Sequence, residues 1–149
     1  MGRIKHYSNF QLQWNKFQCT LNAYNSTQNK CFFMPVNRLS SLKPKERDLA
    51  GFILNKLWVD RYWCGEGRRQ HLGHTSVRNL PKGLPKSEAG AVLDVADKLR
   101  RLGFISFVSA TGDTHVCASR ASDIIDEGLI IVNEFRTKHG QQPLLRNQI

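Results

Sequence analysis

Acidic residues are scarce in this chain, and long apolar runs are absent. Its 149 residues include 12 Asp and Glu against 22 Lys and Arg, which gives a formal net charge of +10. A membrane-spanning helix needs about 20 consecutive apolar residues, and no stretch approaches that length. The first residues also lack the apolar core of a secretion signal, so we expect a cytoplasmic protein that does not enter membranes. Because phosphate binding is driven by Lys and Arg, the charge makes nucleic acid the leading class of partner.

The motifs of several common enzyme classes are missing as well. The Gly-Glu-Gly run at 65–67 is not followed by the Gly-Lys-Ser/Thr of a nucleotide-binding loop, and no Gly-x-Ser-x-Gly occurs. A thiol nucleophile at Cys64 would need His71 or His74 beside it, and no motif sets that geometry. We therefore predict that the protein is not an enzyme and that it carries no cofactor.

Cysteines at regular spacing are missing too. The four cysteines lie far apart in the sequence, at Cys19, Cys31, Cys64 and Cys117. Because disulfide frameworks show recognisable spacings, we predict mostly reduced thiols in an intracellular protein. Cys64, His71 and His74 could form a zinc site together with Cys31 or Cys19. Their C-x₆-H-x₂-H spacing contains no paired cysteines, so we predict that no metal is bound.

What the sequence does contain is a change of hydrophobic period within residues 84–118. Apolar residues recur at helical spacing over 92–102, which predicts an amphipathic helix with Ser87 as its N-cap and Gly103 at its end. The following residues predict a strand, a tight turn and a returning strand, at 104–108, 110–113 and 114–118. A helix followed at once by a two-stranded ribbon is the second half of a winged helix-turn-helix.

The preceding part of the chain supplies a first half for such a unit. An amphipathic helix over residues 45–62, just after Pro44, is predicted by four apolar residues at helical spacing, Leu49, Phe52, Ile53 and Leu57. A glycine-containing loop follows, and Thr75 or Ser76 can then cap a short helix. Helix, turn, helix and ribbon thus follow one another in the order of a winged helix.

Three short motifs lie in this region. They are a His-Thr pair at 74–75, the turn Lys-Gly-Leu-Pro-Lys at 82–86 and a Leu-x-x-Leu-Gly-Phe helix end at 99–104. Together they resemble a winged-helix pattern found in small archaeal proteins of largely uncharacterised function. The resemblance covers residues 71–118 and implies a winged helix that binds DNA or associates with it.

Cations gather before and within the second helix of this unit. Six of them lie between positions 61 and 86 with only Glu66 opposing them, where a helix-turn-helix makes its backbone contacts. Within the helix, Asp94 and Asp97 stand at i,i+4 spacing before Lys98 and Arg101, so we expect phosphate contact rather than base readout. The predicted nucleic-acid-binding residues are Arg68, Arg69, His74, Thr75, Arg78, Lys82, Lys86, Ser87, Lys98 and Arg101.

The two ends of the chain carry apolar faces that need a cover. Residues 10–24 fit either a helix or a hairpin, and we favour the helix because Lys16 suits a two-residue turn poorly. A helix over 122–139 is predicted to be capped by Ser122 and ended by Gly140. Its apolar residues cover more than the ~100° stripe that one domain hides. We therefore predict a homodimer that uses Ile125, Leu129, Val132 and Phe135; the alternative is a monomer in which the two termini cover each other.

The sequence thus predicts a mainly α protein with a small β-wing. A winged helix-turn-helix occupies residues 42–118, between an N-terminal aromatic-rich extension at 1–41 and a C-terminal helix and tail at 119–149. We expect it to bind double-stranded DNA as a transcription-regulator-like or chromatin-associated protein. Two alternatives stay open: the same cations could meet the backbone of RNA in a ribosome-associated protein, or the smooth Ala-Gly-Ala surface at 89–91 could dock a protein partner.

Overall fold

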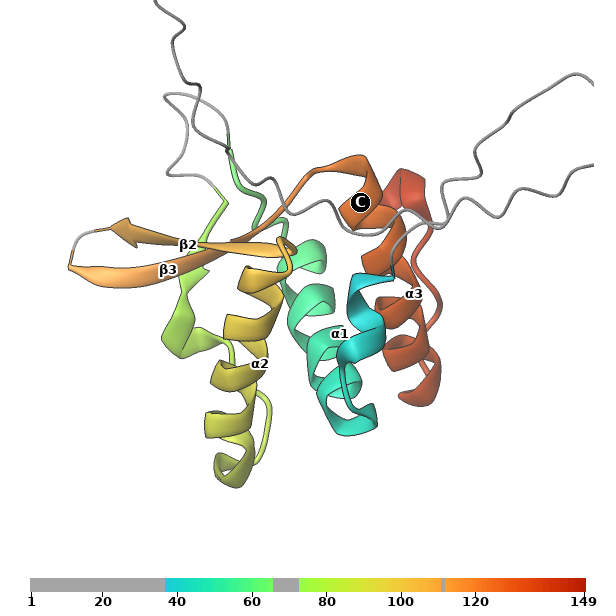
Figure 1. Cartoon of the computed structure of the whole chain (residues 1–149), viewed down its shortest axis with the longest axis horizontal. Coiled ribbons are helices and arrows are strands. Elements are labelled where there is room, and N and C mark those ends of the chain that lie inside the picture. Colours follow the sequence, from blue (N-terminus) through green and yellow to red (C-terminus); the bar gives the residue numbers. More distant parts are fainter. Residues whose placement is uncertain (1–36, 66–72, 111) are drawn as a thin grey trace, which may run out of the picture. The chain divides into compact units, whose positions relative to one another are not determined.

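The computed structural model describes residues 37–65, 73–110 and 112–149 (Figure 1). The elements in these ranges, with η for a 3₁₀ turn, are η1 (Arg38–Ser41), α1 (Pro44–Val59), β1 (Thr75–Ser76), η2 (Val77–Asn79), η3 (Lys86–Glu88), α2 (Ala89–Arg101), β2 (Ile105–Ala110), β3 (Asp113–Ala118), α3 (Ser122–Lys138) and η4 (Arg146–Gln148). The predictions made for residues 10–24, Arg68, Arg69 and His71 fall outside the described residues. Among the described helices, none combines the length and the apolar character that crossing a membrane requires.

The strands form one small antiparallel sheet in the order β1-β3-β2. β2 pairs with β3 along its whole length, so the predicted ribbon with a tight turn is confirmed. β1 adds a third strand on the other edge of β3, with Thr75 opposite Val116 and Ser76 opposite His115. The described chain is therefore a mixed α/β unit of three α-helices and a small sheet, a layout compatible with helices plus a hairpin.

The core lies between the three helices and the inner face of the sheet. α1 lies between α2 and α3 and packs against both (Figure 1). The predicted helical stripes point inward, with Ile53 and Leu57 of α1 and Val92 and Leu99 of α2 fully buried. Phe104, which joins α2 to β2, is also fully buried. Each such side chain stabilises the fold by about 1.5–3 kcal/mol, so hydrophobic burial holds the helices together.

Two glycines allow α3 to approach its neighbours closely. A Cβ atom on Gly51 of α1 would lie 2.5 Å from the Cβ of Phe135 and 2.9 Å from the carbonyl oxygen of Ile131. A Cβ atom on Gly128 of α3 would lie 3.0 Å from the ring of Trp58. Any side chain at Gly51 would therefore force α1 and α3 apart.

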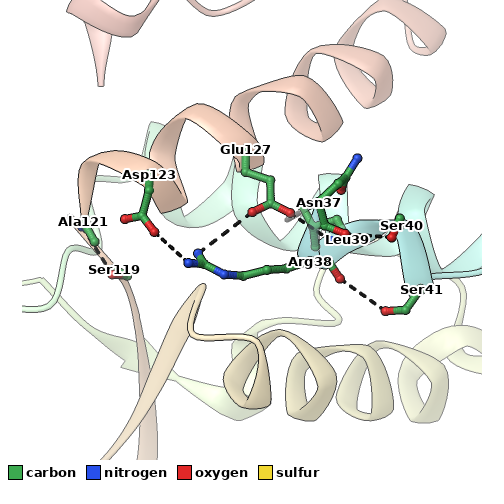
Figure 2. A network of polar contacts seen from close by, with 9 residues as sticks. All are labelled: Asn37, Arg38, Leu39, Ser40, Ser41, Ser119, Ala121, Asp123 and Glu127. Carbon is green, nitrogen blue, oxygen red and sulfur yellow. Dashed lines mark hydrogen bonds and ion pairs between the residues drawn. The ribbon is translucent and has the colours of Figure 1, made fainter. Parts of the chain in front are cut away.

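A polar network fastens η1 to α3 (Figure 2). The guanidinium of Arg38 lies 2.7 Å from Asp123 and 3.9 Å from Glu127. Glu127 also accepts a hydrogen bond from the backbone N–H of Leu39, at 3.0 Å. Two acidic residues near the start of α3 therefore hold η1 in place through tertiary contacts.

Much of the apolar surface of α3 is covered by the chain itself. Ile124, Ile131 and Val132 lie in the core, and Leu144 from the C-terminal tail packs against it. Asn133 holds the tail in place, because its side chain both donates to the carbonyl of Leu144 (3.1 Å) and accepts from its N–H (2.7 Å). Val132 is 0% exposed, so its predicted place in a dimer interface is wrong.

The predicted N-cap of α2 is wrong. The helix begins at Ala89 rather than directly after Ser87, because residues 86–88 form a 3₁₀ turn in which the N–H of Glu88 donates to the carbonyl of Pro85 (2.9 Å). Glu88 then occupies the cap position without a side-chain hydrogen bond. Ser87 is exposed inside this turn.

The ends of the other two helices also differ from prediction. The N-cap of α3 is Ala121, so Ser122 is the first helical residue, and its hydroxyl accepts a hydrogen bond from Arg146 (2.6 Å). α1 ends at Val59 instead of residue 62, because Arg61 adopts a positive φ of 57° that a helix does not permit.

Cys64 and Cys117 form a disulfide, which overturns the prediction of reduced thiols. The two residues are 53 positions apart, so no local spacing reveals the pair. The fold brings them together, because the N–H of Cys64 donates to the carbonyl of Ala118 (2.9 Å) and lays the chain after α1 beside the end of β3. With this bond closed, Cys64 is neither a free nucleophile nor a metal ligand.

Candidate nucleic-acid interface

The turn between β1 and α2 is tied firmly to the rest of the fold. Ser76 begins it, as predicted, with its hydroxyl accepting from the N–H of Arg78 (3.3 Å). The ammonium group of Lys56 in α1 donates to the carbonyl oxygens of Asn79 (2.7 Å) and Lys82 (3.0 Å). Burial lowers the pKa of Lys56, while the two carbonyls accept from two of its three N–H groups. Lys56, which the sequence did not single out, therefore sets the path of the turn.

Three predicted cations on this turn are exposed, namely Arg78, Lys82 and Lys86. The side chain of Arg78 is 86% exposed, and its nearest carboxylate is Asp113 at 3.7 Å, a pair that solvent screens. No ion pair to Lys82 or Lys86 is present in the part of the chain that the structure describes. These charges can meet a phosphate without first breaking a close contact within the protein.

Asp113, at the start of β3, links the hairpin to the beginning of the turn. One carboxylate oxygen accepts from the hydroxyl of Ser76 (2.7 Å), and the other accepts from the backbone N–H of Thr114 (2.8 Å). The hydrogen bond from Ser76, followed by that from Thr114, holds the pKa of Asp113 below its usual value. The carboxylate therefore stays charged and supports the start of the turn.

The cations of α2 are already paired within the chain. Lys98 lies 2.7 Å from Glu46 of α1, while Arg100 and Arg101 lie 2.8 Å and 2.6 Å from Asp97. The hydrogen bond from Arg100 lowers the pKa of Asp97, and the one from Lys98 lowers the pKa of Glu46. To bind a phosphate, these cations would have to leave a carboxylate.

The two ion pairs predicted along α2 have different outcomes. The pair between Asp97 and Arg101 is confirmed. The prediction of a pair between Asp94 and Lys98 is wrong. Lys98 instead pairs with Glu46 of α1, and Asp94 is exposed on the outer face of α2.

The outward face of α2 offers no free cation near its beginning. Gly90 is exposed with no atom within 4 Å of where a Cβ would stand, and Leu93 is 42% exposed. Ala91, expected on this face, is half-buried against the core. The available positive charge therefore belongs to the turn rather than to α2.

The predicted His-Thr pair lies mostly within the fold. Thr75 is 7% exposed, and its hydroxyl accepts a hydrogen bond from Asn79 (3.0 Å). His74 is half-buried, with its Nδ1 atom 2.8 Å from Nδ1 of His115 in β3. Both side chains are committed to contacts inside the protein, so neither adds to the exposed cations.

One cation beside the turn was missed. Lys45, in the first turn of α1, lies 4.0 Å from Glu88 and its side chain is 75% exposed. The start of α1 thus stands next to the end of η3. No local pattern relates these two residues, because 43 positions separate them in the sequence.

Comparison with known proteins adds no assignment to this geometry. No protein-family model, no curated protein and no solved structure matches the chain.

Proposed function

We propose that the protein binds double-stranded DNA as a winged-helix protein, either transcription-regulator-like or chromatin-associated. The observation that carries this proposal is the exposure of Arg78, Lys82 and Lys86 on a turn that Lys56 holds in place. Exposed cations that neutralise phosphates release counterions from DNA, and this release drives binding. A fixed turn also loses less conformational freedom on binding than a flexible one.

The order of the elements supports a winged helix. α1, β1, the turn, α2 and the β2–β3 hairpin follow one another, and β3 lies between the other two strands. In helix-turn-helix proteins, the second helix of the unit lies in the major groove and neighbouring segments contact the backbone. In this proposal α2 is that helix and the hairpin is the wing.

Contact with the DNA backbone is the proposed mode of binding. The cations of α2 are paired with Glu46 and Asp97, and Asp94 is exposed, so few groups are available to read base edges. Phosphate contacts carry no sequence information. We therefore expect similar affinity for unrelated DNA sequences.

The test is fluorescence anisotropy of the full chain with labelled DNA and RNA duplexes of matched sequence, over a range of salt concentrations. We expect saturable binding to duplex DNA, with log K falling linearly with log salt by about 0.9 per phosphate contact. Tighter binding to the RNA duplex would favour the RNA alternative. Absence of binding to both duplexes would refute a nucleic-acid function.

A second function, docking of a protein partner, is favoured by the surface around Leu93. This side chain is 42% exposed on the face of α2 where Gly90 leaves room for close approach. Leu93→Ala removes the apolar side chain without adding charge to α2, so it should release a co-purifying partner and leave phosphate contact through the turn nearly unchanged. Val59→Ala, at a site that is 54% exposed on α1, is the matched control.

We also propose a homodimer that uses α3. Ile130 is 57% exposed on this helix, and Ile125, Leu129 and Phe135 are half-buried. Light scattering should give a dimeric mass that Ile130→Glu converts to a folded monomer, whereas Thr137→Glu, at an exposed polar site, should not. A monomeric mass for the intact chain at micromolar concentration would contradict the proposal.

A further inference from the structure

The outer face of the sheet gathers four side chains whose atoms are common metal ligands. Successive residues of a strand point to opposite faces, so His115 and Cys117 of β3 share one face. Ser76 lies opposite His115, and His74, two residues earlier, points to the same face. Cys64 joins the group through its bond to Cys117.

The two histidines of this group already converge. Their Nδ1 atoms are 2.8 Å apart, and the rings meet edge to face with centroids 4.6 Å apart. Two imidazole nitrogens on one tetrahedral zinc ion, each at about 2.0–2.1 Å from the metal, are about 3.3 Å apart. A zinc ion would therefore require the nitrogens to separate by only about 0.5 Å.

The backbone around the cysteines is held by contacts other than the disulfide. The N–H of Cys64 donates to the carbonyl of Ala118 at 2.9 Å. A Cβ atom on Gly73 would lie 2.5 Å from the carbonyl oxygen of Trp63, so the residue before His74 packs directly on the residue before Cys64. The backbone that carries Cys64 and the residue before His74 should therefore keep its place beside the end of β3 when the disulfide opens.

We propose that, once the disulfide is reduced, Cys64, Cys117, His74 and His115 bind one zinc ion. With the disulfide closed, no group of three His, Cys, Asp or Glu side chains among the described residues is placed to hold a metal. Two cysteines and two histidines are a ligand set typical of closed, four-coordinate zinc sites. The disulfide and the metal exclude each other, because sulfurs bonded to one another cannot serve as thiolate ligands.

The exchange has two steps, reduction of the disulfide and binding of the metal. A dithiol reductant breaks the bond between the two sulfurs, becomes a disulfide itself and passes two hydrogens to Cys64 and Cys117. Zinc then binds the two thiolates and releases the two thiol protons to solvent. The ring that donates from its Nδ1 atom in the pair of His74 and His115 moves that proton to its own Nε2 through solvent, so both rings stay neutral, with Nδ1 free for the metal and one proton on Nε2.

This ligand set differs from the one considered from the sequence. It replaces His71 and the N-terminal cysteines with His115 and Cys117, which only the fold brings near Cys64. It also replaces the prediction that no metal is bound. Zinc binding by these residues does not require DNA binding, so either property can be absent without the other.

The test is a titration of the full chain with Co²⁺ after reduction with a water-soluble phosphine, in a variant that carries Cys19→Ser and Cys31→Ser. Tetrahedral thiolate-bound cobalt absorbs strongly in the visible range, and Zn²⁺ should displace it. We expect one equivalent bound by the reduced protein and none by the oxidised protein. His115→Asn should weaken binding at least about tenfold, whereas His139→Asn, at an exposed histidine after α3, should not.

Two results would overturn the proposal. The first is absence of saturable cobalt binding by reduced protein whose circular dichroism matches that of the oxidised form. The second is binding that persists undiminished when His74 and His115 are both changed to Asn. If His115→Asn alone unfolds the chain, the same titration of His74→Asn decides the question.

Discussion

The two sides of α1 use charged side chains differently. On the α3 side, cations are paired with carboxylates of another element, as Arg47 is with Glu134 at 2.8 Å. On the α2 side, the cations of α2 itself are paired as well, whereas the turn presents Arg78, Lys82 and Lys86 to solvent. A net charge of +10 does not distinguish these two uses. The side-chain contacts distinguish them, because they show which cations hold elements together and which are available to a binding partner.

The largest expected effect concerns packing on the α3 side. Gly51→Ala would place a Cβ atom 2.5 Å from the Cβ of Phe135 and 2.9 Å from the carbonyl of Ile131. We expect the free energy of unfolding to fall by about 2–3 kcal/mol in urea titrations. The matched change on the α2 side, Gly90→Ala, meets no atom within 4 Å and should raise it by about 0.5–1 kcal/mol. Equal losses in both variants would contradict this difference in packing.

A second prediction tests whether the cations of α2 become available once released. Asp97→Asn removes the carboxylate that holds Arg100 and Arg101. DNA affinity should rise about threefold at moderate salt, with a steeper salt dependence. Asp126→Asn makes the same change in net charge on α3, where it frees Arg146, and should have a smaller effect. A similar gain in both variants would mean that net charge alone governs binding.

A smaller effect is expected on the stability of the fold in acid. The hydrogen bond from Ser76, first among its causes, lowers the pKa of Asp113 from 3.8. The unfolded chain therefore binds more protons in the window between the two pKa values. Stability is complete above the unfolded pKa and is lost as the pH falls through the folded one. We expect the free energy of unfolding to decrease below about pH 4.

The variant Asp113→Asn should remove part of this decrease, as measured by urea unfolding across pH. Asp60→Asn, at an exposed carboxylate just after α1, serves as the control for loss of one charge. If the two variants flatten the pH profile equally, the hydrogen bond from Ser76 to Asp113 has no special role.

The elements of the fold could be predicted because their signals are local. Val92 and Leu99 stand at helical spacing, and both are fully buried. Gly112 has a φ of +77° within the predicted tight turn between β2 and β3. Each of these signals depends on a few neighbouring residues, so periodicity and turn chemistry were sufficient.

The missed features depend on residues that are distant in the sequence. The disulfide joins positions 53 residues apart, and Lys98 reaches Glu46 across 52 residues. The incorrect prediction of Ser122 as an N-cap has the same origin, because the Ser122 hydroxyl accepts a hydrogen bond from Arg146 of the C-terminal tail. Tertiary partners of this kind leave no local pattern, and they decide which of the predicted cations are free.

The measurement that tests the central claim most directly compares two variants that lose the same charge. The turn variant carries Arg78→Gln, Lys82→Gln and Lys86→Gln, and the α3-side variant carries Arg47→Gln, Lys138→Gln and Arg146→Gln. Both are first confirmed as folded by circular dichroism, and the slope of log K against log salt is then measured with one DNA duplex. We predict that the slope decreases in magnitude by about 2.7 in the turn variant, since each lost phosphate contact removes about 0.9, and stays at the wild-type value in the α3-side variant. Equal decreases in both variants, or an unchanged slope in the turn variant, would contradict the assignment of the turn as the nucleic-acid interface.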